Sequence, residues 1–315
     1  MQIVITDGYT LNPGDLSWEA FEKLGELKYY DRTSATEIAG RCREANVIIT
    51  NKTPITSDTI NNATNLKLIA VSATGYNIVD IVAAKVKGVP VCNVPEYSTD
   101  SVAQHTFALL LELTNHVGKH AQSVENGEWV RSADWSYVKA PIMELSGKTI
   151  GIIGFGRIGQ KVAEIAKAFG MNVIIYNKGK QSLLAASVTL QDLFTQSDMV
   201  SLHCPLKEDN YGFINGQLLS LMKPTAFLIN TSRGQLINEQ DLSDALLSKV
   251  LAAVALDVLS SEPPAANNPL HGLQNCIITP HNAWISFEAR KRLMQTTLDN
   301  ILAALSGKPV NVVNG

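Results

Sequence analysis

Apolar and polar positions follow two periods along this chain, and segments of one period alternate with segments of the other. Short runs rich in β-branched residues predict strands in the first third, at 2–6, 27–30, 47–50, 66–71 and 89–92. Amphipathic segments between these runs, for example 18–24 and 35–43, predict helices. Strands that alternate with helices are typical of a parallel sheet covered on both faces. The first third therefore predicts one small doubly wound α/β unit.

The same alternation starts again near residue 149 and predicts a second α/β unit. Its strands are expected at 149–153, 172–176, 199–202, 226–230, 251–256 and 276–278. The predicted fold class is thus α/β, with two doubly wound parallel-sheet domains and a cleft between them. Ligands of such folds bind at the carboxyl ends of the strands.

Two longer apolar segments connect the units. Residues 99–116 contain neither Gly nor Pro and predict one long buried helix. Residues 286–306 carry apolar side chains mostly at three- and four-residue spacing and predict a C-terminal helix. We expect this last helix to return to the first unit. The domains would then be 1–98 with 284–315, which is discontinuous, and 99–283.

A glycine-rich turn joins the strand at 149–153 to a helix expected over 161–169. Its sequence, Gly154-Phe155-Gly156-Arg157-Ile158-Gly159, has the spacing G-x-G-x-x-G. The first glycine allows a sharp turn, the second lets backbone approach a pyrophosphate, and the third lets the helix pack closely on the sheet. The helix N-terminus offers N–H groups to the phosphates. The turn predicts dinucleotide binding, and a βα turn without a ligand is the alternative.

Polar residues follow two later strands of the second unit. The strand at 226–230 leads into Asn230-Thr231-Ser232-Arg233-Gly234. A guanidinium group suits bidentate binding of a carboxylate, although an arginine after a strand is also a common surface residue. Asp257 follows the strand at 251–256 and can accept from the carboxamide of a cofactor. A turn-forming aspartate is the other interpretation.

Two further side chains complete a candidate catalytic set. Glu262 precedes two prolines that fix its backbone, and His281 follows a rigid Thr279-Pro280 step after the third strand. A single histidine is more often structural. Arg, Glu and His after three successive strands, beside a dinucleotide fingerprint, favour catalysis.

The remaining histidines have other expected places. His203 ends a strand and is expected to line the cofactor site, and His271 is expected in a loop. His105, His116 and His120, on or near the apolar helix, are expected to be packed or surface residues.

Hydride transfer to a 2-oxo acid requires the roles that this set can provide. Arg233 can hold the carboxylate, and His281 can give a proton to the carbonyl oxygen as negative charge grows there. Glu262, bonded to the other ring nitrogen, would favour the protonated ring. In the first unit, Ala73-Thr74-Gly75 follows a strand, and its N–H groups can form a nest for the substrate carboxylate. An ordinary βα turn is the alternative there.

Composition excludes several classes of protein. The hydrophobic fraction of 45% is ordinary for a globular protein. The net charge of −3 indicates no basic surface for nucleic acid or anionic membranes. No apolar run approaches the roughly 18 residues of a membrane span, and the N-terminus starts directly as a strand without a signal-peptide pattern. Four scattered cysteines lack the spacing of a metal site or disulfide framework, so we expect no metal and a cytoplasmic location.

Over essentially its whole length the chain resembles the D-isomer-specific 2-hydroxyacid dehydrogenases. The residues that carry the resemblance are the glycine turn 154–159, His203-Cys204-Pro205-Leu206, 230–234, Asp257 with Glu262, and Pro280-His281. It implies a flavodoxin-like substrate domain, a Rossmann NAD(P)-binding domain and a homodimer in which helix 99–116 contributes to the interface. The implied catalytic residues are Arg233, Glu262 and His281.

The resemblance also implies binding residues. Those implied for the cofactor are the glycine turn with Asn177, His203, Cys204, Pro205, Thr231, Ser232, Arg233, Asp257, His281, Ala283 and Val102. Those implied for the substrate are Ala73, Thr74, Gly75, Arg233, His281 and Trp284.

One position departs from the NAD pattern of this family. Asn177 stands where an acid is expected about 20 residues after the glycines, and Lys178 and Lys180 follow it. An asparagine can bond a ribose 2′-hydroxyl, and the lysines can tolerate a 2′-phosphate. NAD is expected from the family, and NADP stays open.

Within the family, 7–18, 73–77 and 281–284 are similar to the glycerate dehydrogenase (hydroxypyruvate reductase) branch. The sequence thus predicts reversible reduction of hydroxypyruvate or glyoxylate. The alternatives are a dehydrogenase of pyruvate or a bulkier 2-oxo acid, and a nucleotide-sensing binding protein like the co-repressors of the family. A formate dehydrogenase is disfavoured, because a carboxylate rather than an amide is expected beside the histidine.

Overall fold

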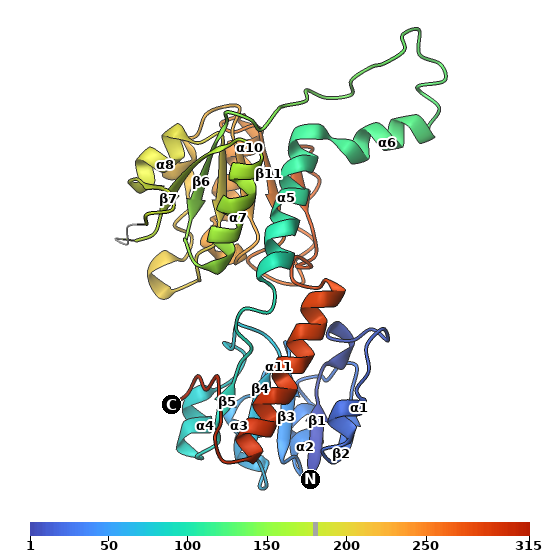
Figure 1. Cartoon of the computed structure of the whole chain (residues 1–315), viewed down its shortest axis with the longest axis vertical. Coiled ribbons are helices and arrows are strands. Elements are labelled where there is room, and N and C mark those ends of the chain that lie inside the picture. The colour runs from blue at the N-terminus through green and yellow to red at the C-terminus, as the bar shows by residue number, and fades with distance from the viewer. Residues whose placement is uncertain (179–181) are drawn as a thin grey trace. The chain divides into compact units, whose positions relative to one another are not determined.

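The computed structural model describes residues 1–178 and 182–315 (Figure 1). The chain folds as two compact units, one formed by Met1–Ser98 with Ile285–Gly315 and the other by Thr99–Trp284. The second unit thus includes Trp284, one residue beyond the expected boundary. No helix in the described ranges combines the length and the apolar character needed to cross a membrane.

The first unit is built on a parallel sheet with the strand order β2-β1-β3-β4-β5. Its strands are β1 (Gln2–Ile5), β2 (Glu26–Tyr29), β3 (Val47–Thr50), β4 (Leu68–Val71) and β5 (Val91–Cys92). Its helices are α1 (Glu19–Glu22), α2 (Ile38–Cys42), α3 (Ser57–Asn62), α4 (Ile81–Val86) and α11 (Phe287–Leu305). This is the flavodoxin-like order of a doubly wound sheet.

Apolar residues on both faces of this sheet explain its two layers of helices. Val4 and Ile48 pack into a core with residues of α2, α3 and α4, whereas Ile3 and Ile49 pack into a second core with α1 and α11. Met294 and Ile301 are the buried α11 residues of that second core. Strands covered on both faces read as continuous apolar runs, which is how the sequence reads here.

The second unit is built on a longer parallel sheet with the strand order β12-β11-β10-β9-β6-β7-β8. Its strands are β6 (Thr149–Ile153), β7 (Asn172–Tyr176), β8 (Ala186–Ser187), β9 (Met199–Leu202), β10 (Phe227–Asn230), β11 (Ala253–Leu256) and β12 (Cys276–Ile278). Its helices are α5 (Thr99–Asn115), α6 (Val117–Glu125), α7 (Arg157–Ala168), α8 (Leu190–Gln196), α9 (Gly216–Leu219) and α10 (Glu239–Leu247). The order is that of a Rossmann sheet with one added strand, and the direction of winding reverses between β6 and β9.

Helices again cover both faces of this second sheet. The core on one face joins residues of α5 and α7 to Ile150, Ile152 and Ile229 of the strands. The core on the other face joins residues of α8, α9 and α10 to Val200 and Leu228. Ligand-binding loops are therefore left at the carboxyl ends of the strands, because the faces are occupied.

Helices α1 and α2 are shorter than the predicted 18–24 and 35–43, and two further differences from the sequence prediction lie in the second unit. Helix α7 begins at Arg157, four residues before the expected start, so it includes the last glycine of the turn. The helix expected over 99–116 ends at Asn115, since His116 takes a left-handed backbone with φ 49°. Helix α6 then begins at Val117, and Figure 1 shows α6 and the segment after it extending away from the sheet of this unit. We name α6 with residues 126–144 the arm.

Candidate active site

The loops after β6 and β9 lie against each other where the winding of the sheet reverses. Gly154 follows β6 with φ 90°, a backbone conformation that residues other than glycine rarely adopt. A Cβ atom on this residue would lie 2.5 Å from the backbone nitrogen of Cys204 and 2.6 Å from the carbonyl carbon of His203. The turn therefore requires glycine for two independent reasons.

The other two glycines of the turn have opposite surroundings. A Cβ atom on Gly159 would lie 2.3 Å from the carbonyl oxygen of Gly154, so the closeness of α7 to β6 depends on this glycine. A Cβ atom on Gly156, directly before α7, would meet nothing within 4 Å. Gly156 thus leaves open space in front of the helix N-terminus, which fits the close approach of a pyrophosphate.

Asn177 and Lys178 follow β7 next to the glycine turn. The Asn177 Oδ1 atom accepts a hydrogen bond of 3.3 Å from the Phe155 backbone N–H, which ties the end of β7 to the turn. Lys178 forms an ion pair with Asp209, and both side chains are exposed. Each partner shifts the pKa of the other, upward for Lys178 and downward for Asp209. Lys180, the second lysine of the sequence prediction, lies outside the described residues.

The segment after β9 is half-buried at His203 and Cys204 and exposed at Pro205. Burial lowers the pKa of His203 to about 3, so its ring is neutral at physiological pH. Its Nε2 atom lies 2.8 Å from Ser201 Oγ, and its buried Nδ1 atom has no hydrogen-bond partner within the described ranges. Burial also raises the pKa of Cys204 to about 11, which keeps the thiol protonated. The carbonyl oxygen of Pro205 accepts a hydrogen bond from the Asn210 side chain.

Arg233 stands in a loop that the side chain of Asn230 fixes. Asn230 is fully buried at the end of β10, and its amide donates to the Arg233 carbonyl while its Oδ1 accepts from the Ser232 N–H. The Ser232 hydroxyl donates to the Leu202 carbonyl, and Thr231 Oγ1 lies 3.2 Å from Thr106 Oγ1. The guanidinium itself donates to the Ser232 carbonyl at 2.7 Å and is half-buried.

The loops after β11 and β12 bring Glu262 and His281 together. The Nδ1 atom of His281 lies 2.6 Å from Glu262 Oε2, and the other carboxylate oxygen accepts from the Leu259 N–H. The two side chains are 24% and 37% exposed, so the ring remains accessible from outside the unit. The Nε2 atom is therefore the nitrogen left to face a substrate.

Asp257 holds the loop that carries His281. Its side chain is 1% exposed and accepts from the backbone N–H groups of Asn282 and Ala283, each at 2.9 Å. The Thr279 hydroxyl donates to the same carboxylate at 2.7 Å. With Oδ1 bonded twice and Oδ2 once, the carboxylate retains capacity for one further donor on Oδ2.

The remaining predicted residues are placed elsewhere. Ala73 and Thr74 belong to the first unit, where the Thr74 hydroxyl donates to the Val94 carbonyl. In the described ranges, the Thr74 and Gly75 N–H groups donate to no protein acceptor, as a nest requires. Val102 is buried on α5, and Trp284 is half-buried at the end of the second unit.

The sequence prediction missed the contacts of α5 with the His281 loop. His105, expected to be a packed or surface residue, places Nε2 3.1 Å from Thr279 Oγ1. One turn earlier, Ser101 donates to the Ala283 carbonyl at 2.7 Å. The available signal was the spacing of Ser101 and His105, which stand four residues apart and therefore lie on one face of the helix.

Comparisons with known proteins place this arrangement among dehydrogenases. Residues 107–283 match the model of the D-isomer specific 2-hydroxyacid dehydrogenase, NAD binding domain. The chain is 48% identical to a hydroxypyruvate reductase of Blautia hydrogenotrophica, with all of both chains covered. It is 40% identical to a glycerate dehydrogenase of Methylorubrum extorquens, with 95% of each covered. Among solved structures, it resembles an acyclic imino acid reductase in complex with NADPH and D-Arg, with 35% identity, a TM-score of 0.87, and coverage of 99% of this chain and 100% of the other.

Proposed function

The chain belongs to the family of D-isomer-specific 2-hydroxyacid dehydrogenases, and from this premise we propose that it reduces hydroxypyruvate or glyoxylate reversibly. The family makes it an NAD-dependent oxidoreductase of 2-hydroxy acids. The 48% and 40% identical relatives are named for hydroxypyruvate and glycerate, which supports the choice of a small substrate. The observation that carries the chemistry is the 2.6 Å hydrogen bond between Glu262 and His281.

The catalytic roles follow from that hydrogen bond. Because Glu262 binds Nδ1, the His281 proton that can move to the substrate is the one on Nε2. Protonated His281 gives this proton to the carbonyl oxygen, where negative charge grows, and Glu262 stabilises the positive ring beforehand. A nicotinamide cofactor, when bound, would supply the hydride for C2. In the oxidation of glycerate, the same nitrogen accepts the hydroxyl proton.

Arg233 is proposed to hold the substrate carboxylate. Strands β10, β11 and β12 are neighbours in one parallel sheet, so the loops that carry Arg233, Asp257 and His281 share one edge. A guanidinium fixed at such an edge binds a carboxylate through two parallel hydrogen bonds. This contact would orient C2 toward the hydride and toward the His281 ring.

NAD is the cofactor that the family model supports, and we propose that Asn177 contacts the ribose. Its Oδ1 is used by the Phe155 N–H, which leaves the amide N–H groups as donors to a 2′-hydroxyl. The positive charge of Lys178 is offset by Asp209, which reduces its attraction for a 2′-phosphate. This arrangement favours NADH over NADPH.

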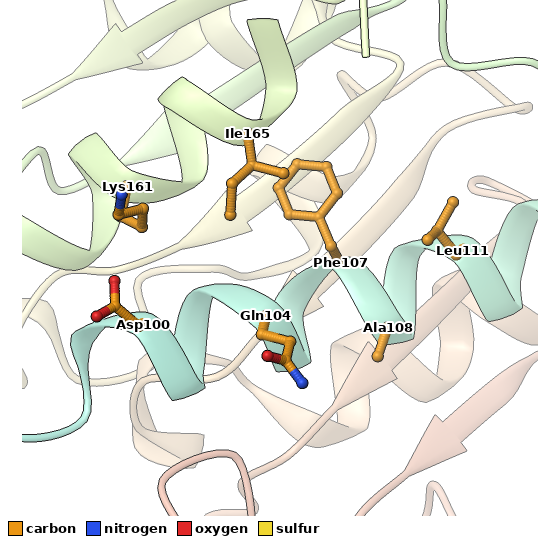
Figure 2. Close-up of a pocket in the computed structure, with 7 residues that line it drawn as sticks. All are labelled: Asp100, Gln104, Phe107, Ala108, Leu111, Lys161 and Ile165. Atoms are coloured by element: carbon orange, nitrogen blue, oxygen red, sulfur yellow. The ribbon is translucent and has the colours of Figure 1, made fainter. Parts of the chain in front are cut away.

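The functional form is proposed to be a homodimer, with the arm as part of the interface. The arm exposes Val117, Val124, Trp129, Val130, Trp135, Val138 and Ile142. On the same unit, α5 and α7 border a groove with Phe107, Ala108, Leu111 and Ile165 as its apolar lining and Asp100 and Lys161 near one end (Figure 2). Exposed apolar surface of this extent is typical of subunit contacts. Sedimentation of the purified chain tests this, and a monomer at micromolar concentration contradicts it.

A cytoplasmic location is also part of the proposal. The cysteines Cys42, Cys92, Cys204 and Cys276 are free, and burial raises the pKa of each thiol to about 11 or 12. Protonated, unpaired thiols suit a reducing compartment.

Steady-state kinetics test the proposed function. Oxidation of NADH and NADPH is measured with hydroxypyruvate, glyoxylate, pyruvate and 2-oxoisocaproate, and we expect the highest kcat/KM with one of the first two and NADH. A higher value with either of the others moves the chain to another substrate class of the family. Binding of NADH without turnover on any acid contradicts the enzymatic proposal and favours a nucleotide-sensing protein.

A further inference from the structure

The chain on both sides of His281 is held by a single residue, Asp257. The carbonyl oxygen of Asp257 accepts from the His281 N–H at 2.8 Å, and its carboxylate accepts from the next two N–H groups. His281 itself has φ 51°, in the left-handed region that residues with a side chain rarely adopt. A loop in this conformation persists only where its surroundings fix it. The position of the His281 ring therefore depends on how firmly Asp257 is held.

Helix α5 contributes a side chain to this arrangement through Thr279. The Thr279 hydroxyl donates its proton to Asp257 Oδ1, so it has only lone pairs left for His105 Nε2 at 3.1 Å. The His105 ring must then donate, which requires the tautomer that carries the proton on Nε2. The result is a chain of hydrogen bonds from His105 through Thr279 to Asp257.

Because His105 lies on α5, this series of hydrogen bonds connects the helix to the loop that carries His281. The Nε2 atom also lies 3.5 Å from Asp257 Oδ1, and the His105 side chain is 21% exposed. Ser101, four residues earlier on α5, binds the Ala283 carbonyl on the other side of the catalytic loop. Two successive turns of α5 thus form hydrogen bonds with the segment 279–283, one at each end. Hydrogen bonds that are connected in a series, as from His105 through Thr279 to Asp257, strengthen one another.

We propose that His105 is a positioning residue for His281, acting through Thr279 and Asp257. It contacts neither substrate nor cofactor in this role. It keeps the Asp257 carboxylate oriented toward the backbone of Asn282 and Ala283, and that backbone sets the direction of the His281 ring. The inference rests on the proposed function, since it concerns the proton donor of that reaction.

Kinetics of three variants of the full-length protein test this series of hydrogen bonds. In His105→Leu we expect kcat to fall about tenfold, with KM for the 2-oxo acid and Kd for NADH changed less than about threefold. His105→Gln retains an N–H that can reach Thr279, so it should recover most of kcat. Thr279→Val replaces the hydroxyl with a methyl group of similar size and should lose as much kcat as His105→Leu. Unchanged kcat in His105→Leu overturns the proposal, as does a loss in His105→Gln equal to that in His105→Leu.

The double variant shows whether His105 and Thr279 act in one series of hydrogen bonds or through two independent contacts. If His105 acts through Thr279, His105→Leu together with Thr279→Val loses no more kcat than the worse single variant. A loss equal to the product of the single losses contradicts the proposal. Thr279→Val with wild-type kcat also contradicts it, and this variant decides the matter even where His105→Leu does not fold.

A measurement independent of turnover reads the His281 ring directly. The chain has six histidines, so the ring signals of protein labelled with ¹⁵N-histidine can be assigned by single substitutions. We expect the His281 signals to shift in His105→Leu and to stay in place in the control His271→Leu, whose histidine is exposed in a loop. Unmoved His281 signals overturn the positioning role. A wild type that reduces no 2-oxo acid contradicts the proposed function instead, and the ring signals still report on His105.

Discussion

The two halves of the seven-stranded sheet hold their loops by different means. After β6, the turn depends on residues without a side chain, since a Cβ atom at Gly154 or Gly159 would lie 2.3 to 2.5 Å from backbone atoms. After β10, β11 and β12, the loops are fixed by polar side chains: Asn230, Asp257 and Glu262 each bind backbone or a neighbouring side chain. The first half is thus defined mainly by shape and the second mainly by hydrogen bonds, although one position after β10 also requires glycine, because a Cβ atom on Gly234 would overlap backbone atoms of Leu259 and Ser260. Substitutions should therefore affect binding in the first half and chemistry in the second.

The largest effect is expected in the half that side chains define, from Arg233→Ala. Loss of a bidentate carboxylate contact should remove about 3 kcal/mol of transition-state stabilisation, which lowers kcat/KM for every 2-oxo acid roughly 150-fold. The Kd of NADH should be nearly unchanged. Arg43→Ala removes an exposed arginine of the first unit and serves as the control. An Arg233→Ala variant with wild-type kcat/KM would remove this residue from the site.

In the half that shape defines, Gly156→Ala should impair binding without affecting stability. The new methyl group meets no protein atom within 4 Å but occupies the space before α7, so Kd for NADH should rise about tenfold, or 1.4 kcal/mol. The melting temperature should stay within about 2 °C. Gly159→Ala is the matched contrast, because its methyl group would meet the Gly154 carbonyl oxygen and lower the melting temperature. Unchanged NADH affinity in Gly156→Ala would show that no phosphate approaches this residue.

A smaller effect is expected from Glu262→Gln, which keeps the size of the side chain and removes its charge. The Glu262 carboxylate lies 2.6 Å from the His281 Nδ1 atom, and its negative charge should stabilise the ring while the ring holds the proton for the substrate. With the neutral amide we expect kcat to fall about fivefold, with the Kd of NADH nearly unchanged. Steady-state kinetics measure the fall, and a wild-type kcat would contradict the pairing.

The smallest effect is expected from Asn177→Asp. A carboxylate at this position should repel the 2′-phosphate and increase the preference for NADH over NADPH by several-fold. Lys178→Ala should weaken mainly NADPH binding, and that difference should decrease with added salt. Titration of both nucleotides measures these changes. Equal affinities in wild type and Asn177→Asp would mean that residue 177 does not face the ribose.

The same contrast explains what could be predicted from the sequence. Residues 149–153, 172–176, 199–202 and 276–278 were predicted as strands with the bounds that the structure has. Buried β-branched runs and obligatory glycines leave a direct signal, because their cause is local. The family and the fold class followed from these signals and from the motifs after the strands, and the family match and the structure confirm both.

Other features have causes that are distant in sequence. The break at His116 depends on one left-handed residue, which apolar periodicity does not reveal, and the arm after it was not predicted. His105 was expected to be packed or exposed, because its partner Thr279 lies 174 residues away. A polar residue on an apolar helix can be assigned only when the facing strand ends are known.

The discontinuous first unit has a consequence for synthesis of the chain. Its sheet is complete once β5 has been made, yet the face with Ile3 and Ile49 also packs against Met294 and Ile301 of α11. About 200 residues separate these parts, and at roughly 5 to 20 residues per second the ribosome needs about 10 to 40 s to add them. During that time one apolar face of the nascent sheet is covered by α1 but lacks α11, while the second unit can already fold. Chaperones that bind apolar surface should therefore find their main target in the first hundred residues of this chain.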